Sequence, residues 1–224
     1  MRRQAPAAVV LVVAKAPVAG LAKTRLAASV GARAAARLAA AALLDTVDSA
    51  RAVRDVTVAC ALTGDLAQAE RTGELAAALR GCVVFPQRGV DFADRLANAH
   101  ADVAARFPGA PVLQVGMDTP QVRPALLTGA LTRLGETDAV LGPAVDGGWW
   151  ALGLRRPADA RVLRGVPMSR PDTGALTAAA LRGIGLRVGP LPMLSDVDTV
   201  VDAVLVAAQA PSSRFARAFA AVGR

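Results

Sequence analysis

The strongest constraint on the fold of this chain is the regular alternation of two kinds of segment. Short apolar runs rich in valine and leucine, such as Ala8–Val13, Val56–Leu62 and Pro111–Val115, are separated by longer segments rich in alanine, leucine and arginine, such as Arg33–Arg51 and Phe92–Arg106. Continuous apolar runs are typical of strands that are covered on both faces, and alternating strands and helices build mostly parallel sheets. The pattern therefore predicts an α/β fold with a mostly parallel central sheet and helices on both faces.

The rest of the chain continues the same pattern. Further strands are expected at 82–85, 139–141, 149–154 and 187–191, and further helices at 65–79, 124–134, 173–182 and 200–208. We expect one domain over residues 1–210, followed by a basic tail over residues 211–224 that forms a peripheral helix or a frayed end. In such sheets ligands bind beyond the carboxyl ends of the strands, so the loops after Ala8–Val13 and Pro111–Val115 are the first places to look for a site.

The composition excludes several classes of protein. Hydrophobic residues make up 54% of the chain and charged residues 20%, which argues against disorder. The formal net charge is +8, but the arginines are scattered and there is no Tyr to add to 5 Phe and 2 Trp as stacking platforms. We therefore expect small anionic substrates and no nucleic acid as partners. The apolar run at 7–14 suits a buried strand and is too short to span a membrane, so we expect a cytoplasmic protein; a homo-oligomer is compatible with the sequence.

Cysteine and histidine are too few to form a zinc site. Cys60 and Cys82 are the only cysteines, and because both lie in apolar runs they are expected to be buried thiols. His100 is the only histidine and is expected on a helix surface. A zinc site needs several such ligands, so the chemistry of this chain must come from other residues.

A loop that carries both lysines of the chain follows the first strand. Lys15 and Lys23 lie within nine residues of each other, next to Arg25, whereas every other basic residue is an arginine. An ammonium on a flexible stem suits a point contact to a phosphate oxygen, Gly20 permits close backbone approach, and backbone N–H groups of such a loop can cradle phosphates. With a single glycine the loop is not a Walker A motif. The alternative is a solvated basic loop.

Acidic residues follow two later strands. Asp118 comes directly after Pro111–Val115, where a carboxylate can hold Mg²⁺ or Mn²⁺ while the ion bridges phosphates, although a turn or helix cap is an equal alternative. Near the end of the chain, the alternation of Asp196 and Asp198 puts both carboxylates on one side, where both could face one ion. Asp198 and Thr199 could equally cap the following helix.

A glycine pair joins the two strands expected at 139–141 and 149–154. The sequence Asp146-Gly147-Gly148 allows close approach of the backbone to a ligand, or makes a simple hairpin turn. Trp149 and Trp150 follow it, and because strand side chains alternate, their rings are expected on opposite faces of the sheet.

Taken in order, these segments resemble a known family. Its landmarks are the lysine loop, Gly89 with Asp91 and Arg95, Asp118-Thr119-Pro120, Asp146-Gly147-Gly148 and Asp196-Val197-Asp198-Thr199. Over residues 8–208 the chain is similar to the glycosyltransferase-A-like (GT-A-like) proteins known as arsenosugar-biosynthesis-associated glycosyltransferases. It resembles more distantly 2-phospho-L-lactate guanylyltransferase and the molybdenum-cofactor nucleotidyltransferases. The resemblance implies a single-domain, Rossmann-like nucleotide-diphospho-sugar transferase fold.

The resemblance also implies roles for individual residues. Asp118 is expected to bind a divalent metal, Mg²⁺ or Mn²⁺, with Asp198 and Asp196 as further carboxylates. Lys23, Arg25 and Asp118 are expected to take part in catalysis. The nucleotide is expected to contact Lys15, Gly20, Lys23, Thr24, Arg25, Asp91, Arg95, Asp146, Gly147 and Gly148. The chain departs from the family pattern at Trp149, where a tyrosine is usual, at Gly116, which replaces the first acid of an Asp-x-Asp motif, and at residues 87–92.

The basic residues of the lysine loop favour nucleotidyl transfer. That reaction attacks the α-phosphate and expels pyrophosphate, so it needs several cations around the triphosphate. We therefore expect a metal-dependent transferase that takes a nucleoside triphosphate and a phosphorylated small-molecule acceptor. Two alternatives stay open: a glycosyltransferase that uses a nucleotide-sugar donor, and a nucleotide-binding module without activity.

Overall fold

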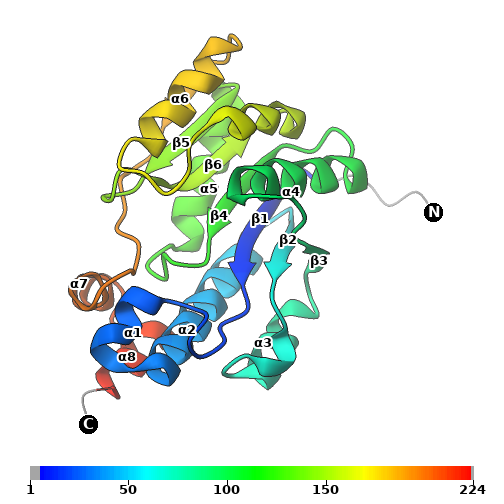
Figure 1. Cartoon of the computed structure of the whole chain (residues 1–224). Helices are drawn as coiled ribbons and strands as arrows, with labels where there is room; N and C mark the ends of the chain where they lie inside the picture. The colour runs from blue at the N-terminus through cyan, green and yellow to red at the C-terminus, as the bar shows by residue number, and fades with distance from the viewer. Residues whose placement is uncertain (1–5, 223–224) are drawn as a thin grey trace.

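A seven-stranded sheet lies at the centre of the computed structural model, which describes residues 6–222 (Figure 1). The strand order is β3-β2-β1-β4-β6-β5-β7. The strands are β1 (Ala8–Lys15), β2 (Val56–Thr63), β3 (Val83–Pro86), β4 (Val112–Gly116), β5 (Ala139–Pro143), β6 (Trp149–Leu154) and β7 (Val188–Pro190). All neighbours pair in parallel except β6, which runs antiparallel to β4 and β5. The predicted mostly parallel sheet is confirmed.

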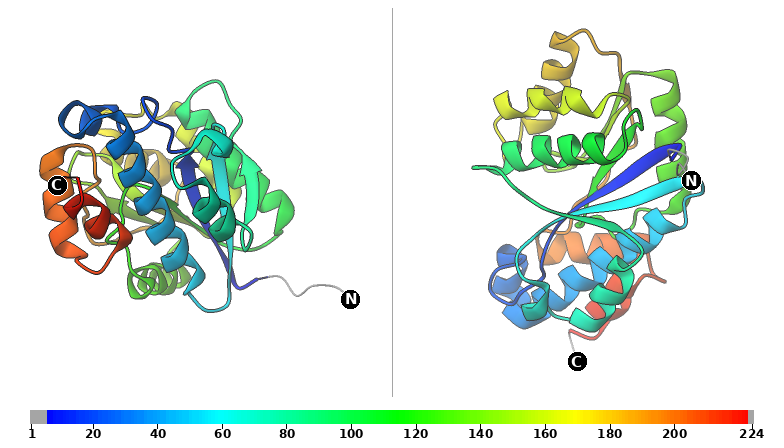
Figure 2. Two further views of the ribbon diagram at one scale, coloured as in Figure 1. Left: turned by 90° about the horizontal axis from the view of Figure 1, so that it is seen from below. Right: turned by 90° about the vertical axis from the view of Figure 1, so that its right-hand side faces the viewer.

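Helices cover both faces of this sheet, and the two layers are visible in the right-hand view of Figure 2. One face is covered by α2 (Ala32–Arg51), α3 (Thr72–Leu79) and α5 (Pro124–Glu136), and the other by α4 (Phe92–Arg106), the 3-10 helix η2 (Pro157–Gly165) and α6 (Thr173–Gly183). Three shorter helices lie beside α2 in a third apolar cluster: α1 (Thr24–Val30), α7 (Val200–Gln209) and α8 (Arg214–Ala220). A further 3-10 turn, η1 (Leu66–Gln68), precedes α3.

Strand β1 illustrates why the strands are continuously apolar. Val10 belongs to the same core cluster as Leu43 of α2, whereas Leu11 belongs to the opposite cluster with Leu96 of α4. Successive side chains of a strand point to opposite faces, so a strand between two helical layers must be apolar at every position. Each such side chain stabilises the fold by about 1.5–3 kcal/mol when fully buried.

The structure differs from the prediction at two short helices. The helix expected over 65–79 is interrupted, because Arg71 adopts a φ of 57° and a left-handed residue cannot continue a right-handed helix. The residues after Lys23, expected to be loop, form the seven-residue helix α1. A helix this short has too few apolar positions to show a clear period in the sequence.

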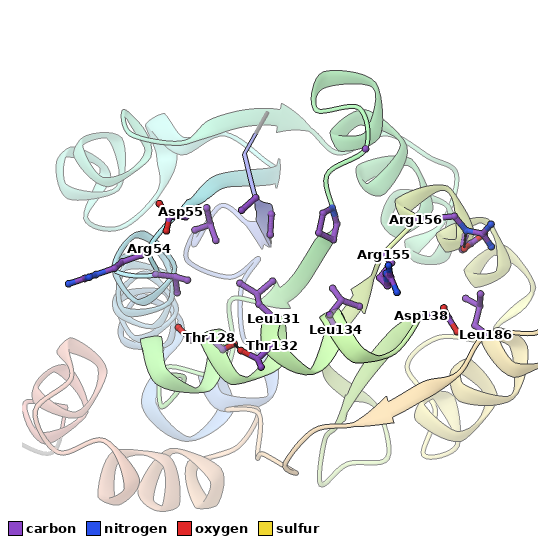
Figure 3. A pocket seen from close by; sticks show the side chains of 18 of the residues that line it. Arg54, Asp55, Thr128, Leu131, Thr132, Leu134, Asp138, Arg155, Arg156 and Leu186 are labelled. Atoms are coloured by element: carbon purple, nitrogen blue, oxygen red, sulfur yellow. Dashed lines mark hydrogen bonds and ion pairs between the residues drawn. The ribbon is translucent and has the colours of Figure 1, made fainter. Parts of the chain in front are cut away.

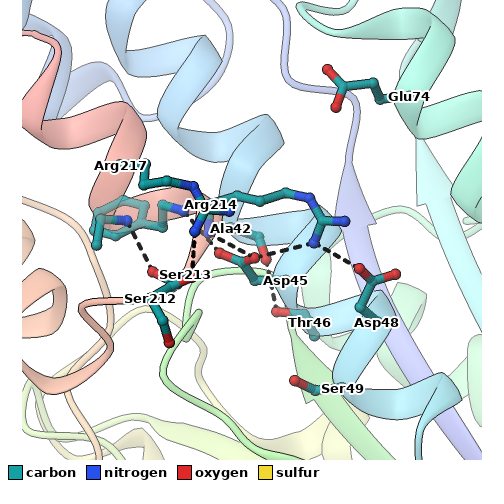
Figure 4. Close-up of polar contacts among 12 residues, drawn as sticks. Ala42, Asp45, Thr46, Asp48, Ser49, Glu74, Ser212, Ser213, Arg214 and Arg217 are labelled. Atoms are coloured by element: carbon teal, nitrogen blue, oxygen red, sulfur yellow. Dashed lines mark hydrogen bonds and ion pairs between the residues drawn. The ribbon is translucent and has the colours of Figure 1, made fainter.

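A buried carboxylate holds the C-terminal helix against α2 (Figure 4). Asp45 of α2 accepts hydrogen bonds from the backbone N–H groups of Arg214, at 3.0 Å, and Phe215, at 2.9 Å, in the first turn of α8. The guanidinium of Arg214 also pairs with Asp48 at 2.6 Å. A carboxylate at a helix N-terminus is favoured by the helix dipole. Residues 214–220 of the predicted tail therefore pack against the domain as α8.

The expected surface position of the histidine is wrong. His100 lies on the inner face of α4 with its side chain fully buried, and its Nε2 is 2.9 Å from Oε1 of Gln114 in β4. Burial disfavours the charged imidazolium and lowers the pKa of His100 to about 4, against a smaller opposing effect of the hydrogen bond that Oε1 of Gln114 accepts. Gln114 could have indicated from the sequence that His100 is buried, because a polar residue within a buried strand needs a buried partner.

The remaining expectations concern the thiols and the membrane. Cys60 is buried, as predicted, whereas Cys82 is only partly buried, and both are free thiols. Across residues 6–222, no helix combines the length and apolar character that a membrane span requires.

Candidate functional site

Two adjacent pockets lie at the carboxyl ends of the parallel strands. The first, which we call the cationic pocket, has a volume of about 240 Å³, and its lining includes Lys15, Lys23, Thr24, Arg25, Asp118 and Asp198. The second, which we call the aromatic pocket, has a volume of about 340 Å³, and its lining includes Lys15, Phe92, Arg95, Asp118, Asp146, Gly148, Trp149, Trp150 and Asp196. Lys15 and Asp118 thus lie at the boundary between the two pockets.

Lys23 is the centre of the cationic pocket. It caps α1 in a left-handed conformation, with φ 50° and ψ 49°, and its Nζ lies 3.0 Å from Oδ1 of Asp118 and 2.8 Å from Oδ1 of Asp198. Burial alone would lower the pKa of Lys23, but the two carboxylates outweigh that effect and raise it. Lys23 therefore stays charged and joins three segments that are distant in the sequence.

Asp198 is free to pair with Lys23 because its neighbour caps the next helix. Thr199 is the N-cap of α7 and forms a reciprocal capping box with Asp202. Burial would raise the pKa of Asp198, but Lys23 and then Arg25, whose guanidinium lies at 3.5 Å, hold it below its ordinary value. The cap alternative left open by the sequence therefore applies to Thr199 and not to Asp198.

Lys15 behaves differently from Lys23. Its Nζ donates a hydrogen bond to the backbone oxygen of Leu21 at 2.7 Å, which closes the lysine loop on itself. Its side chain is exposed, and it forms no ion pair within residues 6–222. Among the described residues, the pocket therefore has one ammonium that is bonded to a backbone oxygen, that of Lys15, and one that is paired with two carboxylates, that of Lys23.

Asp196 is the most perturbed carboxylate of the site. Burial, and then repulsion from Asp118 and Asp146, raise its pKa to about 7. Among residues 6–222, the buried Oδ1 of Asp196 has no hydrogen-bond partner, and the buried Oδ1 of Asp118 has only the ammonium of Lys23, at 3.0 Å. A divalent cation could bind these oxygens, since carboxylate oxygens are the ligands that Mg²⁺ and Mn²⁺ favour.

The donor set therefore fits a divalent metal, but only with help from other ligands. Within the described part of the chain, no group of three or more His, Cys, Asp or Glu side chains is arranged to hold a metal ion. Asp196 lines the aromatic pocket and Asp198 the cationic pocket, so an ion that both face would have to lie at the boundary beside Asp118, and this expectation stays a prediction. Their alternation had assumed an extended strand, and residues 195–198 are irregular.

The two tryptophans lie on opposite faces of β6, as predicted. Trp150 is almost fully buried in the core on the α2 side, and its Nε1 donates to the backbone oxygen of Pro192 at 2.8 Å. Trp149 packs on the α4 side, and its Nε1 donates to Oγ1 of Thr177 at 3.2 Å. Both rings are held in place by polar contacts, which gives the aromatic pocket a rigid wall.

The glycine pair makes the hairpin turn and a pocket wall at the same time. Gly147 has a φ of 87°, and a Cβ there would lie 1.8 Å from the backbone oxygen of Pro171. The backbone N–H of Gly148 donates to Asp146 at 2.8 Å, which orients this carboxylate. The two interpretations of this segment are therefore compatible, and any side chain at Gly147 would displace the neighbouring loop.

The structure brings most of the predicted site residues together. Those that line at least one of the two pockets are Lys15, Lys23, Thr24, Arg25, Arg95, Asp118, Asp146, Gly148, Asp196 and Asp198. Gly20, Asp91 and Gly147 line neither pocket. The carboxylate of Asp91 instead accepts a hydrogen bond from the backbone of Asp94 as the N-cap of α4. The functional roles of all these residues stay predictions.

Three further residues of the aromatic pocket were not predicted. Nε2 of Gln87 donates to the backbone oxygens of β1 and β2, at 2.8 and 2.9 Å, and so ties the end of β3 to these strands. Gln114 lines the pocket from β4, where its polarity within an apolar run was a visible signal. Arg170 comes from the loop before α6 and pairs with Asp172 at 2.9 Å, and its sequence context carries no comparable signal.

A larger hollow, with a volume of about 1250 Å³, lies at the opposite end of the sheet, beside the amino ends of the parallel strands (Figure 3). Several of its charges are already paired, since Arg156 lies 3.0 Å from Asp159, and Asp138 lies 3.1 Å from Arg187. None of the predicted site residues lines it. Because ligands of such sheets bind at the carboxyl ends of the strands, we place the candidate site in the two smaller pockets despite their size.

Comparisons with known proteins identify the family and the fold of this chain. The sequence profile of the family described as "Uncharacterized protein conserved in bacteria (DUF2064)" matches residues 46–170. No curated protein gives a significant match. A solved structure from Desulfovibrio desulfuricans G20, provisionally named a nucleotide-diphospho-sugar transferase, is 29% identical with a TM-score of 0.82. The match covers 97% of this chain and 96% of that chain.

Two more distant structures share the fold. CMP:2-keto-3-deoxy-manno-octonic acid synthetase complexed with CTP is 16% identical, with a TM-score of 0.52, over 91% of this chain and 97% of that chain. The manganese complex of Rv0371c from Mycobacterium tuberculosis H37Rv is 21% identical, with a TM-score of 0.53, over 89% of this chain and 97% of that chain. The predicted nucleotide-diphospho-sugar transferase fold is therefore confirmed.

Proposed function

This chain belongs to the DUF2064 family, and we propose that it is a metal-dependent nucleotidyltransferase that joins a nucleotide to a phosphorylated small-molecule acceptor and releases pyrophosphate. By fold it is a nucleotide-utilising transferase of the GT-A-like class. The observation that carries the finer proposal is the cationic pocket, which gathers Lys15, Lys23 and Arg25 beside Asp118.

The three cations match the charge that this reaction develops. A bound triphosphate carries about four negative charges, and attack at the α-phosphate leaves most of them on the departing pyrophosphate. Cations already in place stabilise that charge without reorganisation, and one such donor is commonly worth about 100- to 1000-fold in rate. In this proposal Lys15, Lys23 and Arg25 bind the phosphates and hold the leaving group.

The carboxylates hold the metal in this proposal. Asp118, with Asp198 and Asp196, would bind Mg²⁺ or Mn²⁺, since the buried Oδ1 atoms of Asp118 and Asp196 have no hydrogen-bond partner among residues 6–222. When bound, the metal supplies further charge neutralisation at the phosphates. The work of the chain's own residues is to fix these oxygens at the boundary between the two pockets.

The aromatic pocket would receive the nucleoside or the acceptor. Its volume of about 340 Å³ falls within the usual range for small-molecule sites. Trp149 and Phe92 offer flat apolar surfaces, and the buried Nε of Arg95 has no hydrogen-bond partner in the described structure. Arg95 can therefore donate to a phosphate or carboxylate on the incoming molecule.

Glycosyl transfer is the second candidate function. It is supported by the name of the 29% identical structure and by the resemblance to arsenosugar-biosynthesis-associated glycosyltransferases. That reaction attacks the sugar carbon and expels a nucleoside diphosphate, so it needs the metal but less of the cationic loop. Nucleotide binding without turnover is the third candidate.

The experiment that tests the proposal compares two leaving groups. Pyrophosphate release is measured with each of the four common nucleoside triphosphates, Mg²⁺ or Mn²⁺, and a panel of phosphorylated small molecules. Nucleoside diphosphate release is measured in parallel with common sugar nucleotides. Pyrophosphate release that EDTA abolishes is the expected result. Release of nucleoside diphosphate alone would contradict nucleotidyl transfer and favour the second candidate.

A further inference from the structure

We propose that Lys23 is a tethered cation that holds Asp118 and Asp198 until the phosphates of a nucleotide draw it away, so that metal and nucleotide bind cooperatively. The inference rests on the proposed function for the identity of the ligands. Its basis is a single contact geometry, in which Nζ of Lys23 lies 3.0 Å from Oδ1 of Asp118 and 2.8 Å from Oδ1 of Asp198.

The ammonium stands where a metal shared by these two carboxylates would have to stand. A divalent ion bonds to carboxylate oxygens at about 2.0–2.2 Å, so an ion held by both Oδ1 atoms must lie between them. Nζ of Lys23 already lies between the same two atoms. Two cations cannot occupy this position together, and therefore metal binding to the pair requires Lys23 to move.

The backbone keeps the ammonium close to this position. Lys23 is fixed in a left-handed conformation at the start of α1, and Leu26 anchors that helix in the apolar cluster beside α2. The side chain of Lys23 is only 10% exposed. An ammonium this buried is stable only with anionic partners, so it leaves the carboxylates readily only when another anion receives it.

A polyphosphate is such an anion, and it arrives together with the metal. Lys23 can turn from the carboxylates to a phosphate oxygen while the metal takes its place beside Asp118 and Asp198. Because the effect of one ligand on the affinity for another is reciprocal, the metal must then also strengthen binding of the polyphosphate. Metal alone, in contrast, has to displace Lys23 without offering it a new partner.

Lys15 provides a matched control in the same loop. It carries the same charge and lines the same pocket, but its Nζ binds the backbone oxygen of Leu21 and no carboxylate within residues 6–222. Removing either lysine changes the general charge of the pocket by the same amount. Only removal of Lys23 frees the oxygens of Asp118 and Asp198.

The first experiment measures binding of Mn²⁺ alone to the full chain, by electron paramagnetic resonance or calorimetry. We expect Lys23→Met and Lys23→Gln to bind Mn²⁺ at least about tenfold more tightly than the unmodified protein, since one charged contact contributes about that much. Lys15→Met should change the affinity by less than about threefold. An unchanged affinity in both Lys23 variants, or an equal gain in Lys15→Met, would overturn the inference.

The second experiment needs no substitution, because the chain contains only two lysines. Acylation of amines, read by mass spectrometry, follows Lys23 with Lys15 as the internal reference. Saturating Mn²⁺ without nucleotide should raise the labelling rate of Lys23 about tenfold and leave Lys15 unchanged. A labelling rate of Lys23 that does not respond to bound Mn²⁺ would refute the displacement.

The outcomes also separate this inference from the proposed function. If the Lys23 variants bind Mn²⁺ no more tightly than the unmodified protein, while the unmodified protein releases pyrophosphate in a metal-dependent way, the inference alone fails. If neither the unmodified protein nor any variant binds Mn²⁺, both the inference and the proposed metal dependence fail.

Discussion

The cationic pocket and the aromatic pocket meet at Asp118, but they treat their charges in opposite ways. In the cationic pocket, Lys23 pairs with two carboxylates and Arg25 lies beside one of them. In the aromatic pocket, Oδ1 of Asp196 and Nε of Arg95 are buried, and within the described part of the chain neither has a hydrogen-bond partner. Because unpaired buried polar groups destabilise a folded protein, these groups lower the stability of the ligand-free protein, and a ligand that binds them can restore it.

This difference means that the two pockets have different states before ligand binds. In the cationic pocket Lys23 is paired with carboxylates, and a ligand must rearrange this pairing. In the aromatic pocket Oδ1 of Asp196 and Nε of Arg95 have no partner among residues 6–222, and a ligand can bind them without displacing one. Substitutions should therefore affect the two pockets with different signs and sizes.

The largest expected effect comes from Asp118, which belongs to both pockets. Asp118→Asn should lower the rate of pyrophosphate release by about 100- to 1000-fold, because it removes the charge that pairs with Lys23 and that would bind the metal in the proposed function. Rates at saturating Mn²⁺ and nucleotide give the measurement. Asp138→Asn, at the opposite end of the sheet, is the matched control and should retain activity. Comparable losses in the two variants would mean that Asp118 acts through the fold.

The next effect concerns the buried pair of His100 and Gln114, of which Gln114 lines the aromatic pocket, and it is tested by changing the pH. The pKa of buried His100 is about 4, below its ordinary value of 6.5, so between these values the unfolded chain binds a proton that the folded chain excludes. Stability present above pH 6.5 is therefore lost as the pH falls towards 4, by about 3 kcal/mol, at about 1.4 kcal/mol per unit of pKa. Urea unfolding at several pH values measures this loss.

His100→Gln supplies the control for this pH dependence, because glutamine does not titrate. The variant should be less stable at neutral pH, but it should lose less further stability between pH 6.5 and 4. If the stability of the variant falls with pH as steeply as that of the unmodified protein, acid sensitivity does not arise from the buried pair of His100 and Gln114.

A smaller effect is expected on ligand affinity in the cationic pocket. Lys23→Ala should weaken binding of a nucleoside triphosphate by about 10- to 150-fold, since a charged hydrogen bond contributes about 1.5–3 kcal/mol. Binding of the matching nucleoside should change little, because it has no phosphate. Calorimetry with both ligands, in the presence of Mg²⁺, gives the comparison. An equal loss for both would indicate that Lys23 acts by shaping the pocket.

The elements of this fold were predictable because their signals are local. The helix at Phe92–Arg106 and the strand at Trp149–Leu154 have the bounds predicted from their apolar periods. The antiparallel direction of β6 could be read only from the turn before it, which the sequence allowed to be either a hairpin or a ligand loop. The interruption of the helix at Arg71 depends on a left-handed backbone conformation that arginine rarely adopts, so the residue type gave no reason to predict it.

The site was predictable in its members but not in their partners. Residue types and positions after strands identified Lys23, Asp118 and Asp198. Their mutual contact was not accessible, because Lys23 and Asp198 are 175 positions apart and meet only when the sheet forms. Asp91 lies outside both pockets for a related reason, since the same carboxylate chemistry that binds a ligand also caps a helix.

The smallest predicted effect is also the most direct test of the contrast between the pockets. Asp196→Asn should raise the free energy of unfolding of the ligand-free protein by about 1–2 kcal/mol, because it removes a buried charge that Asp118 and Asp146 repel. Asp198→Asn should lower it by about 1 kcal/mol or less, because a partly exposed partner of Lys23 is lost. Urea unfolding at neutral pH, without metal, measures both.

The opposite signs are what distinguish this prediction from a general effect of removing an acid. Both substitutions replace aspartate by its uncharged isostere, two positions apart, in the same irregular segment. Only the surroundings differ, since Asp196 faces other carboxylates and Asp198 faces Lys23 and Arg25. A stabilised Asp196→Asn protein that also binds Mn²⁺ more weakly would show that the aromatic pocket retains a destabilising acid for its ligand. A shift of the same sign in both variants would contradict the contrast between the two pockets.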